Sequence, residues 1–524
     1  MTHRTHEGKP LPTAATVRSP LSGEALSCGS VESAEPGRTT YLKLTRGSAA
    51  VRFHPGGIVR LTLSRGDARS PEPSFAVVGE PESLVPETDD AGEIISLSAG
   101  GLTLRVGRRN GDLELVRDPG DTRLETRGGV FLFNRRVLGS RFTLGADDRV
   151  YGLGEKTGFL DKRGRVYEMW NTDEPTHFPT QDPLYVSVPL AIRADVHGAV
   201  GVFLDEPARS WFDIGKDIPD AWSLAAESST LDLYLIVADD LQGVVERYTA
   251  LTGRMELPPA WALGFQQSRY SYVPDSRAIE VARTMREKEI PCDAIYLDID
   301  YMNGFRVFTW DPLRFPDPRA FTDRLAGLGM RVVTIVDPGV KLDPGYNAYR
   351  SGIEGDHFCR RATGEVYEGA VWAGRSAFPD FTRSETRDWW AGLHEVLFEN
   401  GVAGIWNDMN EPADFSGEFY YRPDFTPSAD VTVEPDGQGR RPLERYHNVY
   451  GHLMCEATRT AADRFQPDTR TFVLTRAAHA GTQRHAAVWT GDNHSWWEHL
   501  AAMIPMVLNM GLSGFPFVGG DAGG

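Results

Sequence analysis

The chain has 524 residues and a mass of 58.0 kDa. That exceeds the roughly 250–300 residues at which one hydrophobic core stops growing, so two or more domains are expected. Hydrophobic residues make up 41% and charged residues 24%, which excludes a disordered composition. The formal net charge of -18 disfavours nucleic acids and anionic membranes as partners, because both would repel the mean field of the protein.

The cysteine spacing and the N-terminal segment indicate which metals, membranes and cellular compartment to expect. Cys28, Cys292, Cys359 and Cys455 lie far apart without paired spacing, so neither a zinc site nor a disulfide framework is indicated. We expect no metal and no cofactor. Met1–Gly23 lacks the apolar core of a signal peptide, and no apolar run of about 18 residues follows it. The sequence therefore predicts a cytoplasmic protein that binds no membrane, and it leaves a homo-oligomer open.

The N-terminal half is predicted to be an antiparallel β-sandwich. From about Thr39 to Val237, short alternating runs broken by Gly, Pro and Asp are typical of strands joined by tight turns. Arg109-Asn-Gly111 fits a hairpin loop. The clearest strand candidates are Val51–Phe53, Ile58–Leu63, Leu102–Val106 and Leu113–Val116. We assign residues 39–255 to this domain and expect residues 1–38 to form an irregular lead-in.

After Leu257-Pro-Pro259 the pattern changes to apolar strands that alternate with helices. Two helical stretches are Arg277–Lys288 and Ser384–Phe398, and Ser384 is suited to an N-cap. The candidate strands are Ala262–Gln266, Ala294–Ile299, Val332–Val336, Gly404–Asn407, Thr471–Leu474, Ala487–Trp489 and Phe515–Val518.

Buried parallel strands that alternate with helices form either a (β/α)₈ TIM-type barrel or a doubly wound sheet. The sequence has no glycine-rich phosphate loop, which argues against the doubly wound sheet. We therefore assign residues 256–524 to a barrel.

Acidic residues follow five of the seven candidate strands, where catalytic groups of such barrels lie. Strand ends often carry Asp for turns or helix caps, but capping does not readily explain several carboxylates at one mouth. Cleaving a glycosidic bond needs a carboxylic acid and a second carboxylate. Residue type alone does not say which two act among Asp298, Asp300, Asp337, Asp408, Glu411, Asp492 and Asp521.

The segment Gly404-Ile-Trp-Asn-Asp-Met-Asn-Glu-Pro412 resembles the nucleophile signature of glycoside hydrolase family 31, in its α-glucosidase branch. The resemblance covers roughly residues 140–524. Supporting segments in the family's order are Asp298–Met302, Val371–Trp372, Phe378–Thr382, Gln483–Arg484, Trp489–Asn493 and Val518–Asp521.

The resemblance implies a retaining, exo-acting α-glucosidase that hydrolyses terminal non-reducing α-linked glucose by double displacement. Carried over by motif position, Asp408 is the nucleophile. Asp492 is the acid/base that protonates the leaving oxygen and then activates water. The implied partner is an α-glucoside oligosaccharide.

The resemblance also implies a set of residues that hold the terminal glucose. Asp298, Arg476 and Asp173 match positions that bind its hydroxyl groups. Trp372, Trp406 and Met409 match an apolar wall. The complete expected set is Asp173, Asp298, Ile299, Trp372, Trp406, Met409, Arg476, Trp489 and Asp521.

Three residues and the C-terminal end depart from the family pattern. Ala477 and His479 stand where relatives usually have Ser and Phe, and Ala373 stands where Pro is common. Seven candidate barrel strands precede Gly524, whereas the family continues through an eighth strand, a sugar-binding histidine and C-terminal β-domains. We therefore expect a C-terminally truncated chain whose barrel lacks its last strand and helices.

Three other functions remain open within this interpretation. Two are enzymes of the same family, an α-xylosidase and a transglucosylase that passes glucose to a sugar acceptor. The third is a truncated sugar-binding relative without catalytic activity. The Trp-Asn-Asp-Met-Asn-Glu-Pro form favours a glucosidase over a xylosidase, by resemblance only.

Overall fold

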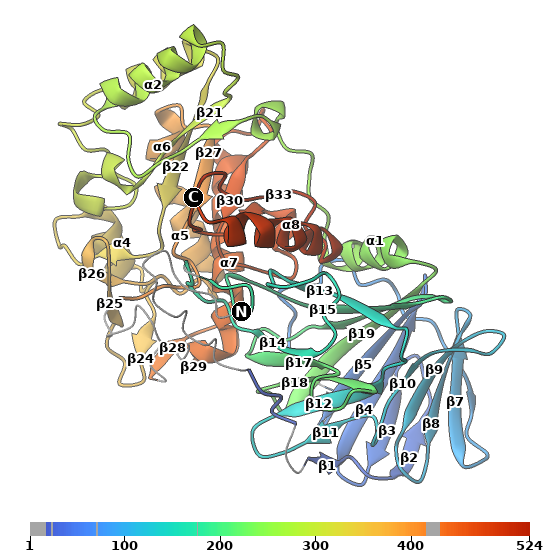
Figure 1. The fold of residues 1–524 in the computed structure, drawn as a ribbon. Helices are drawn as coiled ribbons and strands as arrows, with labels where there is room; N and C mark the ends of the chain where they lie inside the picture. The colour runs from blue at the N-terminus through green and yellow to red at the C-terminus, as the bar shows by residue number, and fades with distance from the viewer. Residues whose placement is uncertain (1–16, 22–24, 70–71, 176, 416–429) are drawn as a thin grey trace, which may run out of the picture.

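The computed structural model describes residues 17–21, 25–69, 72–175, 177–415 and 430–524. In Figure 1 the β-sheets of the N-terminal half lie at one end of the molecule, and the strands and helices of the C-terminal half lie at the other. Helix α8 (Trp497–Leu512) lies where the two halves meet and packs along β13 (Arg149–Gly154).

Three sheets make up the N-terminal half. The largest contains, in spatial order, β13, β15 (Val186–Asp195), β16 (Gly198–Leu204), β19 (Thr230–Ala238), β5 (Ile58–Ser64), β4 (Gly47–His54), β3 (Thr40–Leu44) and β2 (Val31–Glu35). The second contains β1 (Leu26–Ser27), β11 (Leu132–Phe133), β12 (Leu138–Thr143), β18 (Ala221–Ala226), β17 (Ser210–Ile214) and β14 (Arg165–Met169). The third contains β10 (Asp121–Glu125), β9 (Leu113–Arg117), β8 (Leu102–Gly107), β7 (Ile94–Ala99) and β6 (Glu87–Asp89).

Apolar side chains of these sheets meet in one core, which confirms the predicted β-sandwich. Leu61 of β5, Leu104 of β8 and Phe142 of β12 are all buried in it. The hairpin prediction is also confirmed, because Arg109-Asn-Gly111 joins the antiparallel strands β8 and β9. Gly111 has φ 67°, a left-handed conformation that glycine adopts without steric cost.

The expectation of an irregular lead-in over residues 1–38 is wrong for its described part. Residues 31–35 form β2, which pairs with β3, and residues 26–27 form β1, which pairs with β11. Val31 and Cys28 are buried. Both short strands lie at sheet edges, where β1 pairs with the distant β11 and β2 forms a hairpin with the following β3, and their short apolar pattern does not reveal either pairing.

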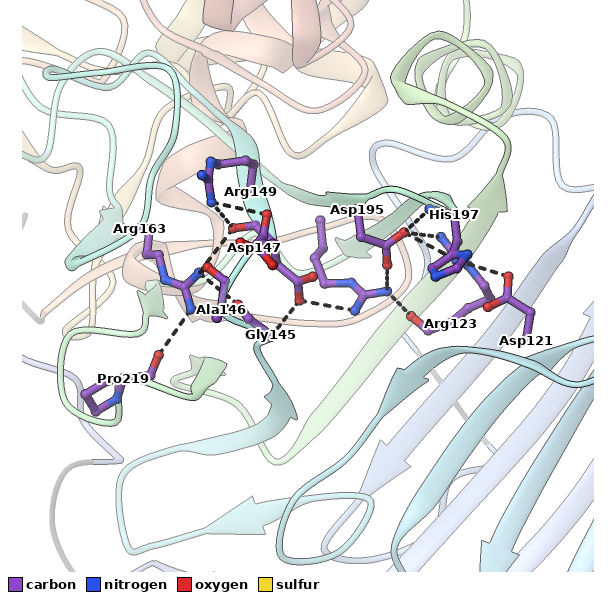
Figure 2. A network of polar contacts seen from close by, with 12 residues as sticks. Asp121, Arg123, Gly145, Ala146, Asp147, Arg149, Arg163, Asp195, His197 and Pro219 are labelled. Carbon is purple, nitrogen blue, oxygen red and sulfur yellow. Dashed lines mark hydrogen bonds and ion pairs between the residues drawn. The ribbon is translucent and has the colours of Figure 1, made fainter.

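A buried ionic network joins the third sheet to the first (Figure 2). Arg123 on β10 contacts Asp195 at the end of β15, with 3.4 Å between Nη2 and Oδ1. Arg193 on β15 contacts the same carboxylate at 3.1 Å and Asp148 at 3.3 Å. Arg193 also donates to the carbonyl of Arg123 at 2.6 Å. Two buried guanidinium groups are thus paired with carboxylates, as buried charges require.

The C-terminal half is built on seven parallel strands whose spatial order is their order in the chain. They are β20 (Gln266–Gln267), β21 (Ala294–Leu297), β22 (Arg331–Val336), β27 (Gly404–Asn407), β30 (Val473–Thr475), β32 (Ala487–Trp489) and β33 (Val518–Gly519). Within the described residues, β20 and β33 each pair on one side only. This is the arrangement of an incomplete (β/α)₈ barrel, as expected.

Alternate residues of these strands belong to different apolar clusters. Ala294 and Tyr296 pack with residues of the barrel interior, while Ile295 and Leu297 pack against helices. Both faces of the strands are therefore buried, which explains their continuous apolar runs. The helices of this half are α2 (Asp275–Glu287), α3 (Pro318–Gly327), α4 (Asn347–Glu354), α5 (Ser384–Leu393), α6 (Glu395–Glu399), α7 (Tyr450–Phe465) and α8.

Short elements complete the described chain. Helix α1 (Leu241–Thr252) packs on β16 and β19 between the two halves. The 3₁₀ turns are η1 (Ala260–Leu263), η2 (Ile299–Tyr301), η3 (Asn303–Phe305), η4 (Leu443–Val449) and η5 (Thr482–Arg484). The small strands are β23 (Val340–Lys341), β24 (Arg360–Arg361), β25 (Glu368–Val371), β26 (Gly374–Ala377), β28 (Val431–Val433), β29 (Arg441–Pro442) and β31 (Ala478–His479).

Two strand predictions were misplaced. Ala262–Gln266 contains mostly a 3₁₀ turn, η1, and the strand is only Gln266–Gln267. Pro259 precedes the turn with φ −63°, a value suited to starting a helical turn. Phe515–Val518 overlaps β33 only at Val518, because the backbone amides of Ser513 and Phe515 close the end of α8 by donating to Asn509 and Met510.

The predicted helix Ser384–Phe398 is divided at His394 into α5 and α6. The His394 ring contacts the Trp390 carbonyl at 2.9 Å, while its backbone amide donates to Ala391 at 3.3 Å, so the helix tightens there. Ser384 is not the N-cap. It is the first helical residue, and its amide donates to Asp436, a tertiary cap that local sequence does not encode.

All four cysteines are buried free thiols, as the sequence indicated. Among the described residues, the structure contains no helix long and apolar enough to cross a lipid bilayer.

Candidate active site

The carboxyl ends of the parallel strands bring the predicted acidic residues together. Asp298 follows β21 and Asp337 follows β22, while Asp408 and Glu411 follow β27. Asp492 follows β32, and Asp521 follows β33. Parallel strands end at one edge of their sheet, so these carboxyl groups share the barrel mouth. The strand-end pattern of the sequence thus predicted which acidic residues lie together.

Arg476, which follows β30, is the centre of this group. Its side chain is 1% exposed and forms a two-point pair with Glu411, with distances of 2.8 and 2.9 Å. Such a fork of two parallel hydrogen bonds fixes the plane of the guanidinium group. The ring of Tyr185 lies 5.0 Å from the guanidinium carbon, which covers a further side of the cation.

The same guanidinium reaches three of the predicted site carboxylates. Arg476 Nε lies 3.1 Å from Asp408 Oδ1, Nη1 lies 3.8 Å from Asp492, and Nη2 lies 3.5 Å from Asp173. Asp173 comes from a loop of the N-terminal half, so both halves of the chain contribute to the site. Burial lowers the Arg476 pKa, but the carboxylates of Asp173, Asp408 and Glu411 raise it well above its usual range.

Asp408 is buried but available for reaction. The Nε hydrogen of Arg476 is directed at Glu411, so its contact with Asp408 is between charges. Asp408 Oδ1 has no hydrogen-bond partner among the described residues. The backbone turns sharply at Met409, whose φ is 55°, a strained conformation of the kind found at functional sites. Met409 Sδ lies 3.1 Å from Arg476 Nη2.

Neighbouring residues hold the segment after β27 in place. The Asn407 amide donates to Thr458 Oγ1 at 3.1 Å, and the Asn410 amide donates to Thr475 Oγ1 at 2.9 Å. Asn410 also accepts from the Ala477 amide at 3.0 Å. These buried bonds fix the backbone on both sides of Asp408.

The carboxyl groups of the mouth disfavour one another's ionisation. Burial raises the pKa of Asp408 well above its usual range, Arg476 opposes that rise, and the charges of Asp337, Asp492 and Glu411 add to it. Burial likewise raises the pKa of Asp298 to about 6 and that of Asp337 to about 7. Several acids that compete for one cation titrate as a coupled group. Arg476 is therefore the main contact that favours an ionised Asp408.

Asp492 has a different environment. Its side chain is 60% exposed, in contrast to the buried Asp408. Burial and the charge of Asp492 both raise the pKa of Asp298, and the charge of Asp492 also raises the pKa of the exposed Asp521. Asp298 and Asp521 therefore face the same space as Asp492.

The aromatic residues of the expected set fall in two places. Trp406 packs edge-on against Tyr296 at 5.9 Å and against Trp489 at 5.6 Å between ring centroids. Trp372 is 43% exposed at the turn between β25 and β26 and packs edge-on against Phe415 at 5.1 Å. The Phe415 amide bonds to Ala370, so this exposed ring is tied to the segment that follows Glu411.

Ile299 of the expected set, and His479 outside it, behave differently from the other residues named so far. The Ile299 side chain is buried in the barrel core, and its backbone amide donates to Asp298 Oδ1 at 2.7 Å. Ile299 thus contacts Asp298 through its backbone amide. His479, which departs from the family pattern, lies on β31, which pairs with β15 of the N-terminal half; burial lowers its pKa to about 4.

The sequence reasoning missed two residues near Arg476. Tyr185 precedes β15 and covers the guanidinium group. Glu155 is fully buried, and neither of its carboxylate oxygens has a hydrogen-bond partner among the described residues. Burial raises the pKa of Glu155 to about 8, with Glu411 contributing. Both residues come from the N-terminal half, and no motif near them in the sequence indicates a contact with the barrel.

One group of side chains has the spacing of metal ligands. His452, Glu456 and His485 offer ligand atoms within 4.8 Å of one another. However, Arg484 Nη2 donates to His452 Nε2 at 3.3 Å, and Arg387 Nε lies 3.2 Å from Glu456. These two guanidinium charges occupy the ligand atoms and would repel a divalent cation.

Comparison with known proteins matches both halves of the chain. A model of the glycosyl hydrolases family 31 TIM-barrel domain matches residues 255–524, and one of the glycosyl hydrolase 31 N-terminal galactose mutarotase-like domain matches residues 48–213. The chain is 43% identical over 482 residues to alpha-glucosidase 2 of Bacillus thermoamyloliquefaciens, covering 91% of this chain and 60% of that protein. It is 38% identical over 395 residues to an alpha-glucosidase of Saccharolobus solfataricus, covering 73% and 57%.

Solved structures agree with these relatives. The GH31 dextranase of Flavobacterium johnsoniae, in its complex with glucose, has a TM-score of 0.86 at 26% identity, covering 94% of this chain and 61% of that one. The ER glucosidase II heterodimeric complex has a TM-score of 0.85 at 25% identity, covering 95% and 64%. The chain thus spans about 60% of the length of the first curated relatives it matches.

Proposed function

This chain belongs to glycoside hydrolase family 31, and from that premise we propose that it acts as a retaining, exo-acting α-glucosidase. The observation that carries the proposal is the contact of one buried guanidinium, Arg476, with both Asp408 and Asp492 at the barrel mouth. Two carboxyl groups on either side of a glycosidic bond are the minimum that this chemistry needs. The proposed substrate is an oligosaccharide with an α-linked glucose at its non-reducing end.

In the proposed first step, the Asp408 carboxylate attacks the anomeric carbon of the terminal glucose. The bond to the leaving oxygen breaks as that oxygen takes the proton of Asp492. The product is a glucosyl ester on Asp408, and the shortened sugar departs. The exposure of Asp492 supports this role, because the leaving sugar must depart through the open side of the mouth.

In the second step, the Asp492 carboxylate removes a proton from water, and the water oxygen attacks the anomeric carbon. The ester bond to Asp408 breaks and the electron pair returns to its carboxylate. Two inversions at one carbon give α-glucose. The mechanism requires the two carboxyl groups to lie about 5–5.5 Å apart.

The remaining polar groups fit the recognition of a terminal glucose. Asp173, Asp298 and Arg476 would bond its hydroxyl groups, and Trp406 with Met409 would cover its apolar face. Arg476 in this role would neutralise the carboxylates around it while its fork to Glu411 holds it still. A buried polar site rejects analogues that lack the bonded hydroxyl groups, because its own groups would be left unpaired.

Product analysis tests the proposal. The chain is incubated with maltose, isomaltose, p-nitrophenyl α-glucoside and p-nitrophenyl α-xyloside, and fresh products are followed by proton NMR. We expect α-glucose as the first product from the glucosides, and none from Asp408→Asn. Faster release of p-nitrophenol from the xyloside than from the glucoside would favour an α-xylosidase. The appearance of oligosaccharides longer than the substrate would favour a transglucosylase. The absence of turnover on every substrate would favour a sugar-binding relative.

A further inference from the structure

The loop that carries Asp492 is attached to the loop that carries Asp173 through a pair of histidines. His499 lies in the first turn of α8 and His177 lies four residues after Asp173. Both rings are buried and stack face to face, with 4.2 Å between centroids and 9° between planes. The contact joins the barrel to the N-terminal half beside the two charged groups of the site.

The hydrogen bonds of His499 define its protonation state. His499 Nδ1 accepts from the backbone amide of His494 at 2.9 Å, so this nitrogen carries no hydrogen. The other nitrogen, Nε2, lies 2.8 Å from the carbonyl oxygen of His177, which can only accept. His499 is therefore the neutral tautomer with hydrogen on Nε2, and it bridges two backbone groups.

The two bridged groups belong to the two functional loops. His494 is two residues after Asp492, and its ring stacks on Trp496 at 4.4 Å. His177 belongs to the loop of Asp173, whose carboxylate contacts Arg476. One imidazole thus spans from the backbone of the acid/base loop to the backbone of a loop in the other half of the chain.

We propose that His499 is a positioning residue that holds the Asp492 loop at its working distance from the Asp173 loop. The proposal rests on the proposed α-glucosidase function. The Asp492 side chain is largely exposed, and among the described residues it forms an ion pair only with Arg476, at a long distance. Its position therefore depends on the backbone of its loop, and His499 fixes that backbone from one side.

Burial and the neighbouring His494 favour a neutral His499, while the His177 carbonyl and the charge of Glu498 on α8 oppose them. The rings of His177 and His494 face His499 from the two loops. Burial lowers the pKa of His499, and it lowers that of His177 to about 4. Protonation of His499 at Nδ1 would remove the bond from the His494 amide, so a neutral ring is the state that positions the loop.

The far end of α8 provides a matched control. Ser513 Oγ accepts from the Gly154 amide at 2.9 Å, and Asn509 exchanges hydrogen bonds with Gly152. These bonds also attach α8 to the N-terminal half, but they lie a helix length away from Asp492. Ser513→Ala removes one such attachment without touching the acid/base loop.

The test compares kcat/KM for maltose with kcat/KM for 2,4-dinitrophenyl α-glucoside, because kcat/KM reports the first step and only maltose needs a proton on its leaving group. We expect His499→Ala to lower the value for maltose about 10- to 100-fold and that for the aryl glucoside a few-fold. His499→Asn can still accept from the His494 amide, and it should recover more of the maltose activity than His499→Gln. Ser513→Ala should lower the melting temperature and leave the ratio of the two substrates unchanged.

Equal losses on both substrates in His499→Ala would overturn the proposal, since a purely structural role predicts that result. A second readout does not need activity. In ¹⁵N-histidine NMR of the full chain, His499 should titrate below the pH of free histidine with hydrogen on Nε2, and His499→Ala should speed amide exchange in residues 490–496. A His499 ring that is protonated or carries its hydrogen on Nδ1 would refute the positioning role. Unchanged amide exchange in His499→Ala would refute it as well. An inactive wild type with the expected NMR and exchange results would refute the proposed function alone.

Discussion

The segments that carry Asp408 and Asp492 are held by different means. Asp408 is buried, and the residues beside it are fixed by hydrogen bonds to Thr458, Thr475 and Ala477, all within the C-terminal half. Asp492 is exposed, and the helix after it is attached to the N-terminal half at both of its ends. Asp408 is thus positioned by its own barrel, and the position of Asp492 depends on a neighbouring domain.

This difference fits the roles proposed for the two groups. A nucleophile needs one defined charge environment, which buried neighbours supply. An acid/base must meet the leaving group and exchange protons with water, so it cannot be enclosed. Its position then has to come from outside the barrel. Substitutions at Asp408, Asp492 and two further buried carboxyl groups test this comparison.

The largest effect is expected from Asp408→Asn. An amide cannot attack the anomeric carbon, so turnover should fall by about 10⁴-fold or more. The melting temperature should stay the same or rise, because the change removes one of several mutually repelling buried charges. Steady-state rates and a thermal melt measure both. If the variant, freed of deamidation, kept more than a few per cent of the rate, Asp408 would not be the nucleophile.

The next effect distinguishes Asp492 from Asp408. Asp492→Ala should lower kcat/KM for maltose by about 10²- to 10⁴-fold but affect an activated aryl glucoside far less, because its leaving group needs no proton. Parallel assays of maltose and the aryl glucoside give the ratio of their kcat/KM values. A uniform loss on both would contradict the assignment of Asp492 as the acid.

A third change tests the support of the nucleophile. Glu411→Gln breaks the two-point pair with Arg476 and leaves a buried cation partly uncompensated, which should cost about 3 kcal/mol of the free energy of unfolding. Chemical denaturation measures this. The matched control is Glu280→Gln, which breaks an exposed pair with Arg277 and should cost less than about 1 kcal/mol. Equal losses would mean that the Arg476 fork contributes no more than a surface ion pair.

The smallest effect on activity is expected from Glu155, whose folded pKa is raised to about 8 from a usual value of 4.5. The folded state then holds a proton that the unfolded state releases, so the stabilising contribution is complete below about pH 4.5 and is lost as the pH rises towards 8. Glu155→Gln should remove this loss and gain about 2 kcal/mol over the wild type at pH 7 relative to pH 5. Melts across this range test it, and identical pH profiles would show that Glu155 ionises freely.

Local pattern predicted those parts of the fold that local physics determines. Alternating runs such as Ile58–Leu63 became sandwich strands, and continuous apolar runs such as Gly404–Asn407 became buried parallel strands. The local sequence pattern failed where a residue far away in the chain determines the structure. Ser384 was expected to cap its helix, but Asp436 accepts its amide. Leu26 and Ser27 were expected to be irregular, but the distant strand β11 provides their partner.

The candidate site likewise has one part that local sequence determines and another that depends on tertiary contacts. The sequence by itself determined that a set of acidic residues shares one barrel mouth, because parallel strands end on the same side and Asp298, Asp408 and Asp492 each follow a strand. Only the tertiary structure decided how those charges are compensated and held. The Arg476 fork to Glu411 and the His499 bridge to His177 join segments that are far apart in the chain. Such contacts leave no periodic signal in a sequence, because each depends on the relative placement of whole elements.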